Sequence, residues 1–230
     1  MQPSKNAVLP ILASTIIAND RCRLYPVVKI SDVDVAVEIL EKLGATCDWK
    51  DGGIDVDTRG IKSNSIDLNL SKKMRASVLF LGALLARFGK AKVFLPGGCK
   101  IGKRPIDFHL SGFESLGYKC SYKENGLIEV FSNKKNILKN KSSINLVGVS
   151  VGATENVIMA SLFLNKEITI NNAAREPEVI ALCKALRKYG VRFKGVGSSS
   201  ITLRPSKFSG GRLKIPADRI VAGTLACCFC

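Results

Sequence analysis

The chain has 230 residues, and its 35 lysines and arginines outnumber its 19 aspartates and glutamates, which gives a formal net charge of +16. This balance predicts an anionic partner: nucleic acid, an anionic membrane or a phosphorylated small molecule. No apolar run reaches the roughly 18 residues that a membrane-spanning helix needs. The densest basic run, residues 133–141, has no aromatic side chains, so we interpret it as a solvated loop. We therefore expect neither nucleic acid nor a membrane as a partner, and we favour phosphorylated small molecules.

Eight cysteines are scattered along the chain. Only Cys227 and Cys230 have CxxC spacing, no second pair matches them and His109 is the single histidine, so no metal site is expected. This pair ends an apolar helical pattern, and we interpret both as core residues and not as a redox pair. Scattered thiols suit a reducing compartment. The apolar segment 7–18 is interrupted by Pro10 and lacks a good cleavage site, so we expect a cytoplasmic protein.

Helical spacing of apolar residues predicts helices, in chain order, over residues 5–17, 34–44, 74–88, 107–117, 152–164 and 180–190. Every second one ends at a glycine: Gly44, Gly117 and Gly190 are spaced 73 residues apart, and each precedes a predicted strand. Three unrelated helices with a common type of capping glycine are the alternative. The equal spacing and the matched flanks favour a threefold internal repeat.

Each repeat is predicted to run helix, strand, loop, helix, strand, turn and strand, with the turns at residues 51–53, 124–126 and 195–197. Repeated helix–strand units that cover one another's apolar faces predict an α/β domain. Residues 218–230 resemble the start of a further unit and stop within a helix. We therefore expect one domain over residues 1–217, followed by the truncated start of a second domain over 218–230, as in a piece of a longer array.

The glycine-rich segment 95–105 places the thiol of Cys99 among cations, just before a helix that is predicted to begin at Pro105. The cations are Lys100, Lys103 and Arg104. Nearby cations and a helix N-terminus both favour the thiolate, so we predict a lowered pKa for Cys99 and an anionic ligand beside it. A small buried cysteine is the alternative. The segment also nearly fits the P-loop pattern, but Arg104 stands in place of the Mg²⁺-binding Ser or Thr, so an NTPase is not expected.

Two further side chains have open interpretations. Arg75 is a charge at the start of an otherwise apolar helix. It belongs either to a solvated first turn or to a cleft that holds an anion. His109 lies beside Phe108 and Leu110 on a predicted helix, a position more typical of a structural histidine than of a ligand-binding one.

Six segments together carry a specific resemblance: residues 5–12, 74–77, 84–89, 95–105, 150–154 and 172–178. Here the chain resembles the UDP-N-acetylglucosamine 1-carboxyvinyltransferase family of enolpyruvyl transferases. The segments are distributed over nearly the whole chain but cover about the first half of the family's length. The resemblance implies two inside-out α/β barrel domains, each of three helix-strand-helix-strand-strand units, with the active site between them. This chain would supply nearly all of one domain.

The resemblance also implies a reaction and its residues. The enolpyruvyl group of phosphoenolpyruvate moves to the 3′-hydroxyl of UDP-N-acetylglucosamine, phosphate is released, and no cofactor takes part. Cys99 is the implied catalytic residue, which protonates the methylene carbon, and Lys5, Asn6 and Arg104 bind phosphoenolpyruvate. The residues implied to hold the UDP-sugar are Arg75, Arg104, Pro105, Ile106, Asp107, Phe108, Gly148, Val149, Ser150 and Val151.

The chain departs from the family in several respects, including residues 2–4, where the family usually has a glycine-rich approach, and several arginines of the second domain, which have no counterpart here. Gly148 stands where some members carry a lysine, which implies the loss of one diphosphate contact. The family's general base, an aspartate of the second domain, has no counterpart here. We therefore expect these 230 residues alone not to catalyse the reaction. The alternatives are a non-catalytic UDP-sugar-binding domain, an enzyme acting on 3-phosphoshikimate, which lacks the cysteine loop, and a binder of RNA or another polyanion.

Overall fold

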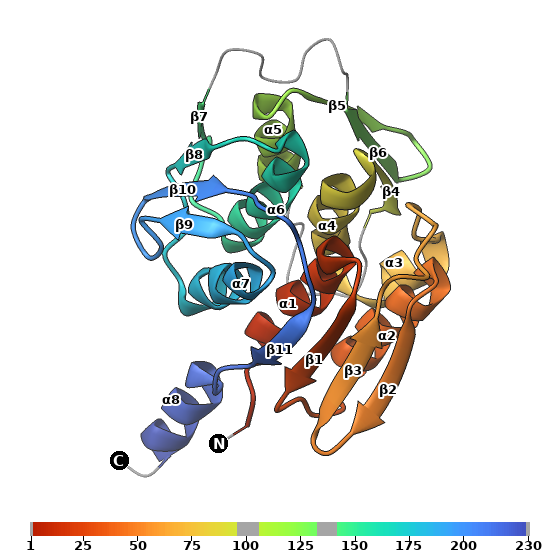
Figure 1. The fold of residues 1–230 in the computed structure, drawn as a ribbon, viewed down its shortest axis with the longest axis vertical. Coiled ribbons are helices and arrows are strands. Elements are labelled where there is room, and N and C mark those ends of the chain that lie inside the picture. The colour runs from red at the N-terminus through yellow and green to blue at the C-terminus, as the bar shows by residue number, and fades with distance from the viewer. Residues whose placement is uncertain (1, 96–105, 133–141, 229–230) are drawn as a thin grey trace.

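The structure is a computed structural model that describes residues 2–95, 106–132 and 142–228. The predicted order of elements recurs three times, so the threefold repeat is confirmed (Figure 1). The first unit comprises α1 (Lys5–Ala18), β1 (Arg21–Tyr25), α2 (Ser31–Leu43), β2 (Thr46–Lys50) and β3 (Gly53–Asp57). The second comprises α3 (Leu68–Lys73), the 3₁₀ helix η1 (Arg75–Val78), α4 (Leu79–Phe88), β4 (Lys90–Phe94), α5 (Asp107–Ser115), β5 (Tyr118–Tyr122) and β6 (Leu127–Ser132).

The third unit comprises β7 (Ser143–Asn145), α6 (Val151–Ser161), the 3₁₀ helix η2 (Leu162–Leu164), β8 (Ile168–Asn171), α7 (Pro177–Lys188), β9 (Arg192–Lys194) and β10 (Ser200–Arg204). A last strand, β11 (Gly211–Lys214), and a last helix, α8 (Arg219–Cys228), follow it. The predicted helix 5–17 is thus found to within one residue. Among the described residues, no helix is both long enough and apolar enough to cross a bilayer.

Each unit builds its sheet in the same way. The third strand lies between the first two, antiparallel to both, in the orders β1-β3-β2, β4-β6-β5 and β8-β10-β9. In the first unit, Asp51 and Gly52 form the two-residue turn between β2 and β3, with φ of 46° and 67°. Two consecutive positive φ values define the hairpin turn whose twist matches the flanking strands. The local sequence therefore explains why β2 and β3 are neighbours in the sheet.

Each sheet also receives a parallel strand from the segment that precedes it around the ring of units. β7 pairs with β8, and Ser65 forms a parallel bridge with Lys92 of β4. The first sheet is completed by β11, from the far end of the chain, which pairs with β1. Beside it, the amide of Ser4 donates to the carbonyl of Pro216 at 2.8 Å. The three units therefore form a closed ring.

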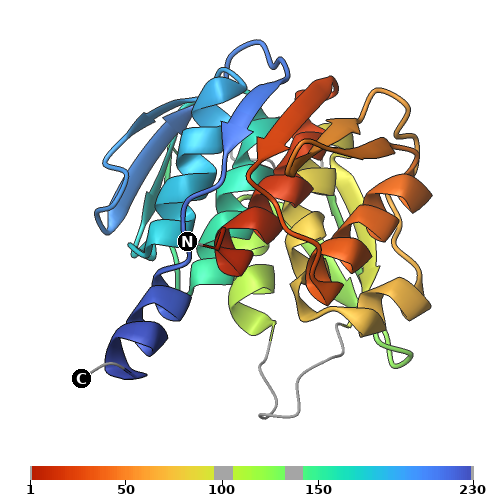
Figure 2. The same ribbon diagram turned by 90° about the horizontal axis from the view of Figure 1, so that it is seen from below.

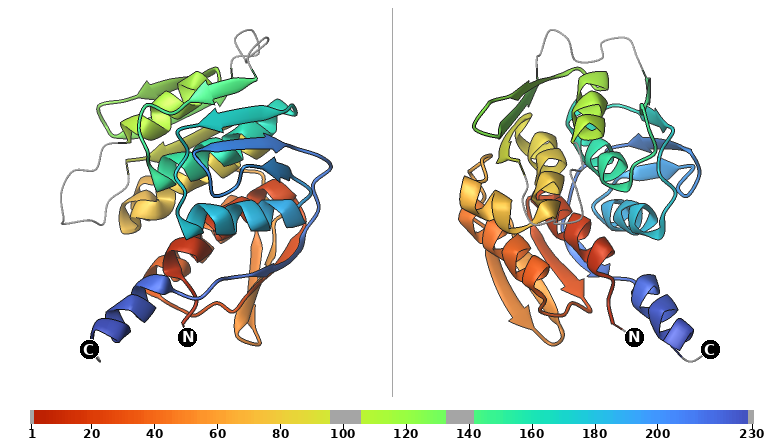
Figure 3. Two further views of the ribbon diagram at one scale, coloured as in Figure 1. Left: turned by 90° about the vertical axis from the view of Figure 1, so that its left-hand side faces the viewer. Right: turned by 180° about the vertical axis from the view of Figure 1, so that it is seen from behind.

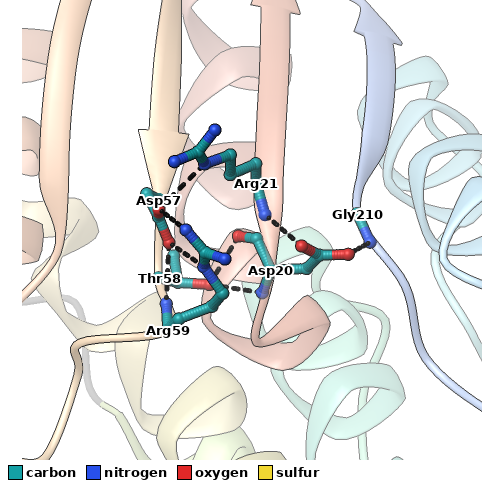
Figure 4. A network of polar contacts seen from close by, with 6 residues as sticks. All are labelled: Asp20, Arg21, Asp57, Thr58, Arg59 and Gly210. Carbon is teal, nitrogen blue, oxygen red and sulfur yellow. Dashed lines mark hydrogen bonds and ion pairs between the residues drawn. The ribbon is translucent and has the colours of Figure 1, made fainter.

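A polar network fixes the place where this ring closes (Figure 4). The carboxylate of Asp20 accepts from the amide of Gly210 at 3.0 Å and from the amide of Arg21 at 2.8 Å. These two hydrogen bonds hold the pKa of Asp20 below its usual value. A Cβ atom at position 210 would lie 1.9 Å from the carbonyl oxygen of Arg21, so only glycine permits this approach. Nearby, Asp57 pairs with both Arg21 and Arg59.

Helices occupy the centre and the sheets lie outside (Figure 1 and Figure 3). Residues 7–18 of α1, 79–86 of α4 and 153–161 of α6 are all buried, so these helices are covered on every side. Such helices are apolar throughout and not on one face alone. The hydroxyls of Ser14, Thr15 and Ser161 each donate at 2.7 Å to the carbonyl three residues earlier, and the hydroxyl of Thr154 accepts from the amide of Ala174 at 3.0 Å. These four buried hydroxyls are therefore hydrogen-bonded.

The helix predicted over residues 74–88 differs from expectation. It begins as the 3₁₀ turn η1, and α4 starts only at Leu79. The side chain of Asn156, from α6, contacts the first turn of α4. Its Oδ1 accepts from the amide of Gly82 at 2.8 Å and its Nδ2 donates to the carbonyl of Val78 at 2.9 Å. Val78 and Leu79 both have right-handed helical φ and ψ values, so the chain passes from η1 into α4 without a break, and Asn156 contacts backbone groups at this junction.

Arg87 → Lys should lower the free energy of unfolding by about 2 kcal/mol, because a single ammonium cannot replace three carbonyl contacts. The Arg87 guanidinium, at the end of α4, donates to the carbonyls of Ile16 at 3.2 Å, Thr58 at 2.8 Å and Ile61 at 2.9 Å. Urea denaturation measures the difference. Arg204→Lys, on an exposed strand position, is the matched control. Equal stability of the two variants would contradict the assigned role of Arg87.

Candidate functional site

The starts of three helices define the candidate site. α1 begins at Lys5, where the Ser4 hydroxyl accepts from the amide of Ala7 at 3.3 Å. α6 begins at Val151, and the hydroxyl of its capping residue, Ser150, accepts from the amide of Ala153 at 3.4 Å. The first turns of α1 and α5 lie on the same side of the molecule, where α8 also projects (Figure 2). Unpaired amides and the helix dipole make such ends favourable for anions.

A hollow of about 280 Å³ lies between the starts of α1 and α6. It brings together Asn6 and Val151, which belong to the two predicted substrate sets, and Ala76, the neighbour of Arg75. Pro10 also lines it and has no amide proton, so it cannot donate to the carbonyl of Asn6 one turn earlier. The remaining lining residues are Leu9, Leu79, Glu155, Glu176, Glu178 and Arg219.

Two predicted UDP-sugar segments meet at the starts of α5 and α6. The ring of Phe108, 44% exposed, lies over Gly148, where a Cβ atom would be 2.6 Å from Cζ of that ring. The glycine therefore makes room for the aromatic ring. One turn further, Gly152 lies beside the ring of His109. The structure thus brings residues 106–108 and 148–151 together, as the resemblance implies, and leaves Val149 exposed.

Arg75 is the first residue of η1 and is partly buried. Its Nη1 atom is buried and has no hydrogen-bond partner. Its positive charge also acts on His109, since burial and Arg75 together lower the pKa of His109 to about 4. A buried guanidinium nitrogen without an acceptor suits an anionic ligand. This placement favours the cleft interpretation of Arg75 over the solvated one.

The start of α1 is also tied to the end of the chain. The ammonium of Lys5 forms an ion pair with Asp32, at the start of α2. The backbone amide of Lys5 donates to Oδ2 of Asp218 at 3.3 Å. The other oxygen of Asp218 accepts from the amides of Ile220 at 2.9 Å and Val221 at 3.1 Å. One carboxylate therefore holds the first turns of α1 and α8, and the contact with α1 was not predicted because the two residues lie more than 200 positions apart.

Acidic side chains form one wall of the hollow. Glu155 is buried, its Oε1 has no hydrogen-bond partner, and burial raises its pKa well above the ordinary value. The charges of Glu178 and Glu176 raise it further. Glu178 is itself paired with Arg219 at 3.2 Å. Its surroundings therefore favour the protonated form of Glu155, and no local sequence pattern predicted this.

Residues 2–228 match the family model of EPSP synthase (3-phosphoshikimate 1-carboxyvinyltransferase). The chain belongs to this family. A UDP-N-acetylglucosamine 1-carboxyvinyltransferase from Buchnera aphidicola is 41% identical, and one from Caldanaerobacter subterraneus is 40% identical; each match covers 96% of this chain. Both matches cover 52% of the relative, so the chain spans about half the length of the curated relatives it matches.

Solved structures of the family share the fold. The enolpyruvyl transferase NikO from Streptomyces tendae superimposes with a TM-score of 0.80 at 16% identity, over 98% of this chain and 53% of that chain. EPSP synthase from Acinetobacter baumannii gives a TM-score of 0.69 at 15% identity, over 96% and 50%. The resemblance to enolpyruvyl transferases and the inside-out α/β fold predicted from it are thereby confirmed.

Three residues of the predicted site lie outside the described residues. They are Cys99, Arg104 and Pro105, so their roles as the acid and as substrate ligands stay predictions. Ile106 caps the start of α5 and Asp107 opens that helix, which confirms a helix immediately after the cysteine segment. Over the ranges that the structure describes, no group of three or more His, Cys, Asp and Glu side chains could hold a metal ion.

Proposed function

We propose that this chain is the nucleotide-sugar half of a UDP-N-acetylglucosamine 1-carboxyvinyltransferase, which catalyses the first committed step of peptidoglycan synthesis in the cytoplasm. One observation carries the proposal: the segments 106–108 and 148–151, distant in sequence, lie together at the starts of α5 and α6, and Arg75 acts on His109 of the same helix pair. The 40% and 41% identical relatives bear this enzyme's name. The positive net charge has a simple explanation, because both substrates are anionic.

The proposed reaction is an addition followed by an elimination. The 3′-hydroxyl oxygen of the sugar adds to C2 of phosphoenolpyruvate while Cys99 gives a proton to the methylene carbon, and the hydroxyl proton goes to a base. Loss of phosphate, and of a proton from the new methyl group, then restores the double bond. Lys5, Asn6 and Arg104 hold the phosphoenolpyruvate end. The two cations of this set, Lys5 and Arg104, stabilise charge that develops on the phosphate in the transition state.

The base and several ligands belong, in this proposal, to a second domain. α8 supports the division at residue 217, because no residue of α8 in the described part of the chain is buried. Ile220 is 51% exposed and Leu225 is 53% exposed on this helix. A helix with exposed apolar residues suits a contact with further protein. We therefore assign residues 1–217 to one domain and 218–230 to the next. We expect the isolated 230-residue chain to bind UDP-N-acetylglucosamine but not to catalyse the transfer.

Arg75→Ala should weaken the binding of UDP-N-acetylglucosamine by about tenfold or more, since it removes a charge-assisted hydrogen bond in a partly buried site. Isothermal titration calorimetry with the 230-residue chain measures the dissociation constant. Arg192→Ala, on the exposed strand β9, is the matched control and should bind as the wild type does.

Turnover is measured as phosphate release from phosphoenolpyruvate, with Cys99→Ser as the control. No release with intact UDP-sugar binding is the expected result, while release that disappears in Cys99→Ser would show that the second domain is dispensable. Tighter binding of shikimate 3-phosphate than of UDP-N-acetylglucosamine would overturn the proposed substrate.

A further inference from the structure

The side chain of Asn156 joins the two central helices α4 and α6 to α5. It is completely buried and makes three hydrogen bonds. Two of them are made with the backbone of Gly82 and Val78, where η1 passes into α4, and in the third its Nδ2 lies 2.8 Å from Nδ1 of His109. A buried amide with three partners at these distances has no freedom to reorient.

The backbone partners fix which end of the amide is which. The Gly82 amide can only donate, so the atom of Asn156 that faces it must be the acceptor Oδ1. The Val78 carbonyl can only accept, so the atom that faces it must be Nδ2. The same Nδ2 faces His109 and has only hydrogens to offer. Nδ1 of His109 must therefore be an unprotonated acceptor, and a neutral ring then carries its proton on Nε2.

The surroundings of His109 agree with a neutral ring. Burial and the positive charge of Arg75 lower the pKa of His109 to about 4. Arg75, on η1, is the charged group that acts on this ring, while Glu155, on α6, has Glu176 and Glu178 as its charged neighbours. His109 thus stays uncharged next to a cation at neutral pH.

The other ring nitrogen lies within the candidate site. Nε2 of His109 would be 3.5 Å from a Cβ atom at Gly152, in the first turn of α6. That turn follows Ser150 and Val151, both predicted to hold the UDP-sugar, and the buried Nη1 of Arg75 has no partner. The Nε2–H of a neutral His109 and the Nη1 of Arg75, whose charge acts on this ring, are two donors that together carry a single positive charge.

We propose that Asn156 is a positioning residue that fixes His109 as a neutral imidazole with its proton on Nε2, so that His109 donates a hydrogen bond to an oxygen of the nucleotide sugar beside Arg75. The ligand part rests on the proposed function, whereas the state of the ring does not. Asn156 acts through His109 and does not itself touch the ligand.

The state of the ring is measured directly, because His109 is the only histidine in the chain. Nitrogen-15 NMR of the unliganded 230-residue chain should show a neutral ring protonated on Nε2 at pH 6 and above. Asn156→Asp offers a carboxylate oxygen in place of Nδ2, so it should protonate Nδ1 and move the His109 titration upward by about one pH unit or more. Asn125→Asp, in an exposed turn, is the matched control and should leave the titration unchanged. A wild-type ring protonated on Nδ1, or a titration near pH 6.5, would overturn the positioning role without any need for a variant.

The donor role is measured by calorimetry with UDP-N-acetylglucosamine. His109→Phe should weaken binding by about tenfold, and His109→Gln, which keeps an N–H near the position of Nε2, should restore most of the loss. Unchanged binding in His109→Phe would overturn the donor role and leave the proposed function standing. If the wild-type chain does not bind UDP-N-acetylglucosamine, both the proposed function and the donor role are overturned. The positioning role of Asn156 is still tested, because the nitrogen-15 NMR experiment needs no ligand.

Discussion

Gly82→Ala should lower the melting temperature by about 5–10 °C, equivalent to a loss of about 3 kcal/mol at this chain length. A Cβ atom at position 82 would lie 2.5 Å from the carbonyl oxygen of Asn156, 2.6 Å from its Oδ1 and 2.9 Å from its Cα. Two of these atoms belong to the backbone of α6, so no side-chain rotation relieves the clash. The helices α4 and α6 must move apart, in the centre of a core that is close-packed.

Thermal unfolding followed by circular dichroism measures this effect. Gly223→Ala is the matched control, since Gly223 lies in the helix α8 and a Cβ atom there would meet nothing within 4 Å. Alanine favours a helix over glycine, so this control should be neutral or slightly stabilising. A Gly82→Ala variant as stable as Gly223→Ala would show that α4 and α6 can separate freely.

Glu155→Gln should raise the free energy of unfolding above about pH 5, by a margin that grows with pH. The carboxyl of Glu155 keeps its proton in the native state, because burial raises its pKa well above the ordinary value. The unfolded chain releases that proton above about pH 4.3, so the wild type loses up to about 1.4 kcal/mol of stability per pH unit until the native pKa is reached. Glutamine does not titrate and avoids the loss, and below about pH 4 the two proteins should converge. Urea denaturation at several pH values measures the margin.

Glu129→Gln is the control with the opposite sign. Glu129 lies on β6, and hydrogen bonds from Lys123 and Lys92 lower its pKa to about 2. Its native carboxylate therefore stabilises the fold above its ordinary pKa, and that contribution is lost as the pH falls toward 2. This variant should be less stable than the wild type at neutral pH. Parallel pH trends in the two variants would contradict both assignments.

Local patterns predicted most of the elements, and long-range pairing explains what they missed. Apolar spacing and the three capping glycines located the helices and the hairpins, because those features depend on neighbours within a few residues. The strands β7 and β11 and the bridge at Ser65 were not predicted. Each is short and pairs with a segment far along the chain or in another unit, so its own sequence carries little signal.

The candidate site was also predicted only in part, and again the long-range contacts were missed. The resemblance named Asn6, Phe108, Gly148 and Val151, and the structure brings them to the starts of helices that lie near one another. The 3₁₀ turn before α4 was not predicted, and neither was its contact with Asn156, which lies more than 70 residues further along the chain. The sequence pattern also favoured a structural role for His109. Its hydrogen bond to Asn156 could not be foreseen, since it exists only where three elements meet.

During synthesis on the ribosome, β1 emerges long before β11, the partner of its outer edge: 190 residues separate Asp20 from Gly210 at this junction. Until then the nascent first sheet carries an unpaired edge, which can pair with another chain. Linear repeat proteins acquire stability one unit at a time. In this chain the first sheet is completed only when β11 pairs with β1. We therefore expect the three units to become stable at the same time, after β11 has been synthesised. The need for chaperones should be greatest just before β11 emerges from the ribosome.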